Sequence, residues 1–482
     1  MLPVSRRMIQ HYMNNGYEKR PSLGPALERS NAPALTPIIS CVVELTVPMP
    51  TSGPASIQID ASLNCQLACP LCPTADGRVK PALGGGHLKL ADFEKLLDLN
   101  PQIAHVELSN YGEMFLNPQL ADILACAFER NVTVGGNNGV NLNFVREDAL
   151  EAVVRYRVQG LKVSIDGATQ ETYSRYRVNG SLSRVLANID AIRALRRRHE
   201  TAFPVLQWQF VVFGHNEHEI KMARTMATER GMEFFPKLSW DAEYSPVRDQ
   251  ELVRIESGLG AANRSEYLKQ RGAEYTRDIC MQLWHAPVLN WNGAILGCCV
   301  NYWGDFGGNA FDSSLPEVLA SPKMDYARNM LTGKAEARPD IPCSTCGQYA
   351  GIRDSARWLT ESEIEGRHRL RHTAGIMLHA DPSIKFAQVM VCRGTNKRPV
   401  WRASGRLFRF GVDHAVYFSP PAPGAYTVFA RALGPAGWMP VVVLPLEIES
   451  RPLCQGFTLD LSEPTVLTQT DESIECLTLR IL

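Results

Sequence analysis

The sequence lacks three features that would place it in a broad class at once. It has no excess of charge, because 50 Lys and Arg residues balance 50 Asp and Glu residues, so no bulk field attracts nucleic acid or an anionic membrane surface. It has no run of the roughly 18 apolar residues that a membrane-spanning helix needs. Its first residues include arginines but no apolar core of a secretory signal. We therefore expect a cytoplasmic protein without nucleic-acid or membrane partners.

Cysteine is too sparse for a disulfide scaffold, with 13 residues in a chain of 482, but it is clustered. Several cysteines lie two or three residues apart, which favours metal or redox chemistry in a reducing cytosol. The isolated cysteines are expected to be small core residues; they are Cys41, Cys126, Cys392, Cys454 and Cys476.

The chain is long enough for about three domains, and its pattern changes along its length. From residue 57 to 239, short β-rich runs alternate six times with helical patterns. This alternation predicts an α/β fold, a partial (β/α)6 TIM-like barrel over residues 56–245, with ligands at the carboxyl ends of the strands. The other expected parts are an N-terminal extension (1–55), a polar linker (246–275), a cysteine-bearing domain with a trailing helix (276–378) and a C-terminal antiparallel β-sandwich (379–482).

The first cysteine cluster directly follows the first predicted strand. Cys65, Cys69 and Cys72 form a C-x3-C-x2-C triplet on a loop. Three thiolates at this spacing can converge on one iron–sulfur cube and leave its fourth iron without a protein ligand. A structural zinc site is the alternative, and it would need a fourth ligand nearby.

This triplet resembles that of the radical S-adenosylmethionine (SAM) superfamily, and the resemblance continues through the barrel. It implies a [4Fe-4S] cluster whose open iron binds SAM, and reductive cleavage of SAM to a 5′-deoxyadenosyl radical. The segment Asn110-Tyr-Gly-Glu-Met114 lies in the place of the family's Gly-Gly-Glu-Pro motif, and the block that begins at Ser164 is similar to the family's "SIDG…Y…R…G" pattern. The resemblance assigns SAM contacts to Gly112, Glu113, Asn138, Ser164, Arg177 and Val212.

A second set of cysteines resembles the SPASM/Twitch extension of radical SAM enzymes. Cys280, Cys298, Cys343 and Cys346 suffice for one auxiliary [4Fe-4S] cluster, and no further cysteines follow the C-x2-C pair at the spacing of a full SPASM domain. Cys299 is an open alternative to Cys298. A zinc site made of the same four thiolates is also open, because an all-cysteine tetrahedron suits zinc as well.

The spacing of these cysteines resembles that of sugar-modifying and aminocyclitol-modifying members of the Twitch group. The resemblance implies an oxidoreductase or lyase that abstracts hydrogen from a hydroxyl-bearing carbon of an aminoglycoside-type substrate, leading to dehydrogenation, dehydration or epimerisation. It also implies a low-potential electron donor such as flavodoxin or ferredoxin. The alternatives are a ribosomal-peptide maturase and, from another class, a non-catalytic iron–sulfur carrier or a zinc-bearing binding protein. The candidate bases near strand ends or in the Twitch loop are Tyr111, Asp166, Glu243 and Asp305.

Overall fold

The computed structural model describes most of the chain between residues 53 and 461. The described ranges are 53–366, 372–381, 383–384, 386–394, 399–405 and 414–461. The chain divides into two units, Met1–Thr46 and Val47–Leu482, and every described residue lies in the second. Residues 1–52 of the predicted extension, with Cys41, and the C-terminal Cys476 lie outside the described residues.

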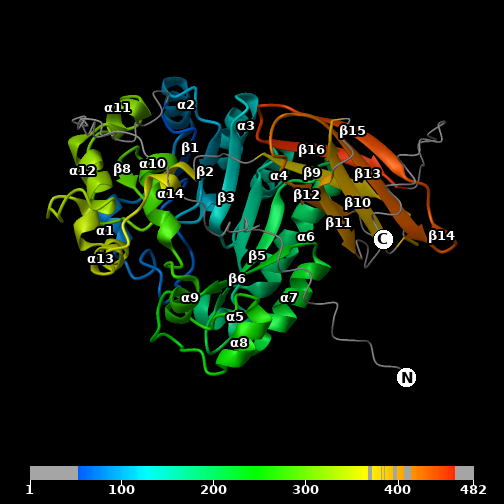
Figure 1. The fold of residues 1–482 in the computed structure, drawn as a ribbon, viewed down its shortest axis with the longest axis horizontal. Coiled ribbons are helices and arrows are strands. Elements are labelled where there is room, and N and C mark those ends of the chain that lie inside the picture. The colour runs from blue at the N-terminus through cyan, green and yellow to red at the C-terminus, as the bar shows by residue number, and fades with distance from the viewer. Residues whose placement is uncertain are drawn as a thin grey trace, which may run out of the picture. The chain divides into compact units, whose positions relative to one another are not determined.

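Six parallel strands form the predicted barrel sheet (Figure 1). They are β1 (Ser56–Ile59), β2 (His105–Glu107), β3 (Thr133–Val140), β4 (Gly160–Ser164), β5 (Val205–Val212) and β6 (Glu233–Leu238). They pair in the order β6-β5-β4-β3-β2-β1, and each pair is parallel. The α/β prediction is therefore confirmed, and all carboxyl ends of these strands meet at one edge of the sheet.

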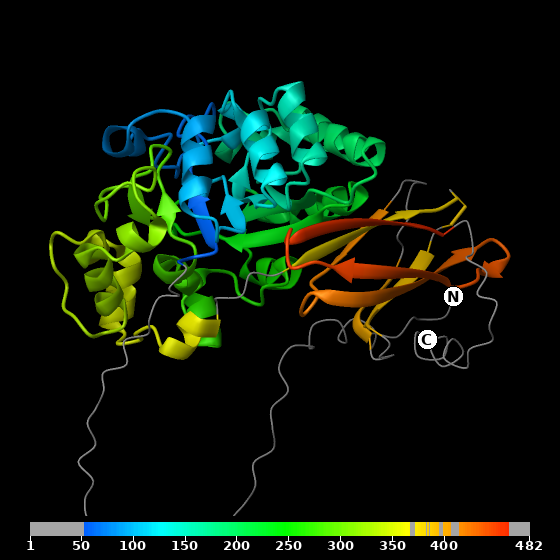
Figure 2. The same ribbon diagram turned by 90° about the horizontal axis from the view of Figure 1, so that it is seen from above.

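Helices connect the strands and cover one face of the sheet (Figure 2). They are α1 (Val79–Leu83), α2 (Leu90–Leu99), η1 (Met114–Leu116), α3 (Leu120–Glu129), α4 (Glu147–Arg155), α5 (Gln170–Tyr176), α6 (Leu182–Arg198), η2 (Glu217–Glu219) and α7 (Ile220–Glu229). Their apolar residues recur at helical spacing; α4, for example, buries Leu150, Val153 and Val154 and exposes its polar side chains. Each large apolar side chain that is fully buried in this way contributes about 1.5–3 kcal/mol.

A hairpin from the cysteine-bearing domain extends the same sheet beyond β1, which the sequence did not predict. Strands β7 (Val288–Leu289) and β8 (Ile295–Gly297) are antiparallel to each other, and β7 pairs in parallel with β1. Gly293 turns this hairpin at a φ of 85°, in the left-handed region that favours glycine. The second cysteine set is therefore attached directly to the strand that precedes the first set.

The rest of this domain is helical. Its elements are η3 (Arg277–Met281), α10 (Gln282–His285), α11 (Leu315–Leu319), α12 (Pro322–Leu331), η4 (Pro342–Thr345), α13 (Gly347–Asp354) and α14 (Glu361–Gly366). At the end of the range expected for this domain and its trailing helix, 276–378, residues 373–379 form a strand instead. Thr373–His379 buries five consecutive residues and pairs with one strand on each side, so sheet pairing overrides the charged pattern of the preceding residues.

The expected polar linker contains two helices, α8 (Gln250–Ser257) and α9 (Arg264–Arg271). Asp249 and Asn263 cap their first turns with side-chain oxygens, and Gly258 and Gly272 end them in the left-handed conformation. The region expected as a polar linker is therefore partly helical, because its polar composition hid these start and stop signals.

The C-terminal part forms two sheets around one core, as the β-sandwich prediction expects. The strands are β9 (Thr373–His379), β10 (Phe386–Arg393), β11 (Pro399–Gly405), β12 (His414–Phe418), β13 (Gly424–Gly434), β14 (Gly437–Trp438), β15 (Val442–Ile448) and β16 (Cys454–Asp460). One sheet joins β10, β11, β13, β14 and β15, and the other has the order β12-β9-β16. Side chains of both sheets share one buried cluster. The pairing is antiparallel except between β9 and β16, which are parallel.

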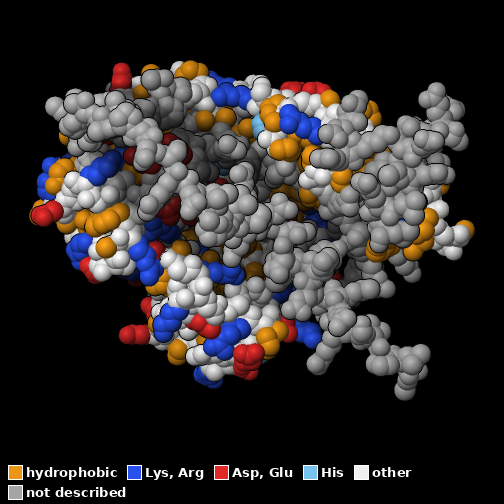
Figure 3. Space-filling model, in the orientation of Figure 1, with side chains coloured by type: hydrophobic (Ala, Val, Ile, Leu, Met, Phe, Trp, Pro, Cys, Tyr) orange, Lys and Arg blue, Asp and Glu red, His pale blue; other side chains and the backbone are white. Residues whose placement is uncertain are grey.

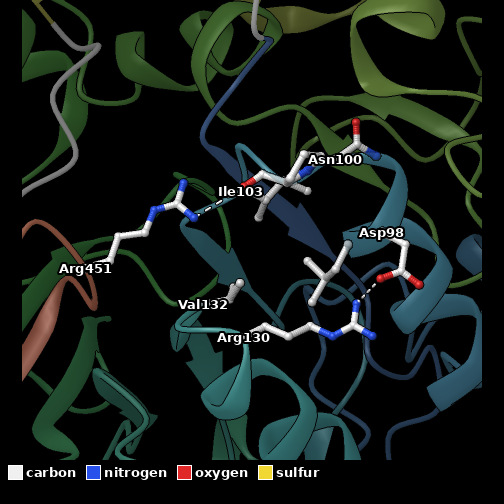
Figure 4. Close-up of a pocket in the computed structure, with 8 residues that line it drawn as sticks. Asp98, Asn100, Ile103, Arg130, Val132 and Arg451 are labelled. Atoms are coloured by element: carbon white, nitrogen blue, oxygen red, sulfur yellow. Dashed lines mark hydrogen bonds and ion pairs between the residues drawn. The ribbon is translucent and has the colours of Figure 1, made fainter.

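The sandwich contacts the amino-terminal side of the barrel sheet. Arg451 donates hydrogen bonds to the carbonyl oxygens of Pro101 and Gln102, at 3.3 and 2.9 Å. Beside it lies a cavity of about 310 Å³, into which Arg130 also projects, held by Asp98 (Figure 4). This cavity lies near the amino-terminal ends of β2 and β3, opposite the edge where ligands of such folds bind.

Two surface observations agree with the composition. On the face drawn in Figure 3, cationic and anionic side chains of the described residues are interspersed. No helix among the described residues is long and apolar enough to cross a membrane.

Cys126, Cys392 and Cys454 are buried, as expected for isolated core cysteines.

Candidate active site

The first cysteine set lies on the loop that follows β1. Cys69 is buried, and Cys65 and Cys72 are half-buried; all three are free thiols. The amide of Cys72 donates to the carbonyl of Cys69 at 3.0 Å, and the amide of Ala68 donates to the carbonyl of Val178 at 3.1 Å. These backbone bonds fix the loop against the segment that follows α5.

Two side chains direct hydrogen-bond donors at this set. Asn141 Nδ2 lies 3.7 Å from Cys65 Sγ, and a terminal guanidinium nitrogen of Arg177 lies 3.7 Å from Cys69 Sγ. Such donors stabilise negative charge on a thiolate, and hydrogen bonds to the sulfurs also tune the potential of a cluster. Asn141 directly follows β3, which places it at the carboxyl edge of the sheet. The sequence analysis missed it, although this position was the available signal.

Gly112 and Glu113 pack tightly behind the triplet. A Cβ atom on Gly112 would lie 1.9 Å from the carbonyl oxygen of Ser62, so only glycine fits there. Glu113 is buried, and its carboxylate accepts from the amide of Asn141 at 2.6 Å and from that of Phe115 at 3.3 Å. Burial raises the pKa of Glu113 to about 7, and these two amides oppose the rise.

Asn138 and Ser164 also lie at this edge. Asn138 Nδ2 donates to Asn110 Oδ1 at 2.8 Å, and Ser164 Oγ accepts from Gln209 Nε2 at 3.2 Å. Both side chains therefore have one polar partner and remaining hydrogen-bond capacity.

Strand alternation separates Val211 from Val212. Val212 is buried in the main core, whereas Val211 packs in a cluster with Cys69 and with the aromatic rings of Tyr176 and Phe213. Adjacent residues of a strand point to opposite faces. Val211 is therefore the side chain that lies beside the triplet.

The four candidate bases occupy very different surroundings. Asp166 is fully buried; its Oδ2 accepts from Arg177 Nε at 2.6 Å and its Oδ1 from the amide of Val211 at 2.6 Å. Glu243 and Asp305 are exposed. The hydroxyl of Tyr111 is buried and has no hydrogen-bond partner among the described residues.

Beside Tyr111 lies a carboxylate that the sequence analysis did not single out. Asp60 follows β1, is fully buried, and accepts the amide of Tyr111 through Oδ1 at 3.0 Å. Its Oδ2 has no hydrogen bond of normal geometry within the described chain, nor does Nδ2 of the nearby Asn110. Burial raises the pKa of Asp60 to about 7, while Tyr111 and Asn110 oppose the shift. These unpartnered groups mark a polar site at the ends of β1 and β2.

The second cysteine set is brought together from three segments. Cys280 lies in η3, Cys298 follows β8, Cys343 lies in η4, and Cys346 caps α13. Burial raises the pKa of Cys280, and the neighbouring thiols of the other three add to this shift. The four side chains are thus close enough to act on one another electrostatically.

Cys299 points away from that set. It packs in a separate cluster with Tyr111 and Tyr302, and the charges that act most on its thiol are those of Cys298 and Lys237. The amide of Cys299 donates to Gln282 Oε1 at 2.8 Å, and Gln282 Nε2 donates to Gln58 Oε1 on β1 at 3.2 Å. This chain of hydrogen bonds ties the cysteine loop to the barrel, and the arrangement favours Cys298 over Cys299 as the fourth ligand.

The donor sets fit iron–sulfur cubes. A cube takes each thiolate on a different iron. Three free thiols on one loop and four around a second point match one cluster with an open corner and one with none.

Comparisons with known proteins give one match to a protein family, over the second cysteine set. Residues 280–347 match the model of SPASM, an iron-sulfur cluster-binding domain, while no curated protein matches the sequence. The fold is similar to Streptococcus suis SuiB bound to S-adenosylmethionine, at 15% identity over 62% of this chain and 72% of that one, with a TM-score of 0.45. It is also similar to BtrN in complex with AdoMet and 2-DOIA, at 15% identity over 61% of this chain and 93% of that one, with a TM-score of 0.36.

Proposed function

We propose that the chain is a radical SAM enzyme that acts on a hydroxyl-bearing carbon of a sugar or aminocyclitol. Its SPASM match and its two cysteine sets support [4Fe-4S] clusters and SAM as its cofactors. The observation that carries the proposal is the triplet after β1, whose sulfurs receive hydrogen bonds from Asn141 and Arg177. When bound, the first cluster and SAM supply a 5′-deoxyadenosyl radical that removes a hydrogen atom from the substrate. Oxidation, elimination or epimerisation can follow.

The chain's own residues would position the cofactor. Cys65, Cys69 and Cys72 would hold the first cluster. Glu113 lies against the triplet with its carboxylate aligned by two backbone amides, and we assign it to the amino group of SAM. Arg177 is fixed in place by Asp166 and offers its remaining donors to the carboxylate of SAM.

The remaining SAM contacts and the second cluster follow the same logic. Asn138 would contact the ribose of SAM, and Ser164 would contact its carboxylate. Gly112 would allow the backbone to approach SAM closely, and Val211, rather than Val212, would line the SAM site. Cys280, Cys298, Cys343 and Cys346 would hold the auxiliary cluster. A low-potential flavodoxin or ferredoxin would supply the electron.

The substrate base is assigned by elimination among the buried groups. Asp166 is committed to Arg177 and Val211, and Glu243 and Asp305 face solvent. The Tyr111 hydroxyl and Asp60 Oδ2 are buried and have no hydrogen-bond partner among the described residues, and Tyr111 packs in one cluster with Cys299. We therefore place proton transfer at this pair.

The test is anaerobic reconstitution followed by measurement of 5′-deoxyadenosine formed from SAM under reduction. A triple alanine variant of Cys65, Cys69 and Cys72 should abolish cleavage, and a triple alanine variant of Cys126, Cys392 and Cys454 is the matched control. Substrates carrying deuterium at the carbinol carbon should transfer the label into 5′-deoxyadenosine. Transfer from a peptide and not from any sugar would favour a peptide maturase instead. Four irons with one zinc per chain would refute the auxiliary cluster and leave the radical step intact.

A further inference from the structure

Three cationic side chains gather at β4 and β6 without an acidic partner. Lys162 lies on β4, Lys237 lies near the end of β6, and Arg264 begins α9. All three are half-buried, and none forms an ion pair with a described residue. Partly buried cations usually pair with a carboxylate or bind an anion.

The two lysines point away from the covering helices. Phe234 of β6 packs against Phe210 and under the guanidinium of Arg224 in α7, so Lys237, three positions later, faces the other side of the sheet. Lys162 lies between Leu161 and Val163, which are both fully buried in the helix-covered core. Both lysines therefore reach into the interior of the barrel.

The contacts of these cations leave much of their charge unneutralised. Lys162 Nζ lies 4.0 Å from the centre of the Phe235 ring, and the Arg264 guanidinium lies 5.0 Å from that of Tyr275. Arg264 also donates to the carbonyl oxygen of Leu238. Burial, with the charges of Arg264 and Lys162, lowers the pKa of Lys237 to about 8.

The carboxylates that attract the cations are engaged elsewhere. Glu107 accepts from Ser109 Oγ at 2.5 Å and from the amide of Asn137 at 2.8 Å. Glu233 accepts from the side chain of Gln207 at 2.7 Å, and Asp166 is bound to Arg177. No carboxylate of the described residues contacts Lys162, Lys237 or Arg264.

Lys237 connects the group to the first cysteine set on one side and to Cys299 on the other. Lys237 Nζ is 5.9 Å from the ring centre of Trp240, whose ring meets Tyr176 edge-on, and Tyr176 packs with Cys69. On its other side, Lys237 acts electrostatically on Cys299. A substrate that reacts beside the first cluster would therefore lie within reach of these cations.

We infer that Lys162, Lys237 and Arg264 form a binding site for the phosphate group of the substrate, so that the substrate is a phosphorylated sugar. The inference rests on the proposed function for the identity of the sugar part. Arginine and lysine together suit a phosphate, because the guanidinium offers paired donors and each ammonium a compact charge. Three cations around one dianion also relieve the mutual repulsion that the free site carries. A cationic aminocyclitol without phosphate would bind this site poorly.

The test is calorimetric binding to the reconstituted holoenzyme, with inorganic phosphate and glucose 6-phosphate as probes and glucose, glucosamine and glucuronate as comparisons. Glucose 6-phosphate should bind at least tenfold more tightly than glucose, and more weakly as salt is added. Lys162→Met, Lys237→Met and Arg264→Met should each weaken phosphate binding about tenfold or more. Lys237→Arg should restore most of the binding, and Lys221→Met, on the exposed surface of α7, should leave it unchanged.

Phosphate binding that is unaffected by all three methionine variants would overturn the inference. Equal binding of glucuronate and glucose 6-phosphate would overturn the commitment to phosphate. A shifted auxiliary-cluster potential in Lys237→Met, with phosphate binding unchanged, would mean that the lysine only offsets cluster charge. Formation of 5′-deoxyadenosine by the wild-type enzyme is measured separately, so that failure of the proposed radical chemistry is distinguished from failure of the phosphate site.

Discussion

The buried ion pair of Asp166 and Arg177 offers the sharpest test of how the site is built. The side chain of Asp166 is 0% exposed and that of Arg177 is 14% exposed. The carboxylate binds two donors at once, Arg177 Nε at 2.6 Å and the amide of Val211 at 2.6 Å. In Asp166→Asn the single amide oxygen can accept only one of them, and the new NH2 group faces the other donor.

The expected cost is large. Removing one partner of a buried pair leaves an uncompensated charge and costs about 3–5 kcal/mol, against a total stability of about 5–15 kcal/mol for a typical domain. Released from Asp166, Arg177 should also lose its fixed position beside Cys69, so the variant should bind SAM more weakly and show an altered cluster spectrum.

Asp98→Asn is the matched control. Asp98 pairs with Arg130 at 2.5 Å, but the two side chains are 67% and 34% exposed, so its loss should cost at most about 1 kcal/mol. The assay is urea unfolding of both variants under anaerobic conditions, with SAM binding measured in parallel. Equal destabilisation of the two variants would refute the argument that burial, rather than the ion pair alone, makes Asp166 important.

Other changes test the remaining assignments. Cys298→Ala should lower the iron content from about eight to about four per chain, whereas Cys299→Ala should keep about eight; the reverse would contradict the ligand assignment. Glu363→Gln should lower the free energy of unfolding by about 1 kcal/mol after allowance for solvent screening, because Arg277 holds the pKa of Glu363 down at about 2. This contribution is complete above the ordinary carboxyl pKa and is lost progressively as the pH falls from there through about 2, so denaturation at pH 7 and at pH 5.5 should give the same loss; a loss confined to pH 7 would argue against the pair. Gly112→Ala should cost about 1–3 kcal/mol and weaken SAM binding, since the new methyl group overlaps a backbone carbonyl of the triplet loop; a variant with normal melting and SAM binding would show that the loop can move aside.

The sequence by itself determined the features that depend on local pattern. The alternation of strand-like and helix-like patterns of apolar residues predicted the six parallel strands and their helices, because each pattern depends on a few neighbouring residues. The spacing of Cys65, Cys69 and Cys72 predicted one loop with three thiols for the same reason. The helices in the expected linker were not predicted, because its polar composition hid their capping signals. Asn263 and Gly272, for example, begin and end one of these helices.

Only the tertiary structure decided which side chains meet. The choice of Cys298 over Cys299 and of Val211 over Val212 depends on the face to which each residue points, which sequence spacing alone does not settle for two adjacent residues. The hairpin β7–β8 joins the sheet through pairing with a strand more than 200 residues earlier in the chain. Lys162, Lys237 and Arg264 lie outside both cysteine motifs, and only the fold brings β4, β6 and the start of α9 close enough for the charges of Lys162 and Arg264 to act on Lys237. Burial of the core enforces this long-range packing. The packing therefore brings the cysteines, which the sequence already identifies as ligands, together with their neighbouring side chains in one site.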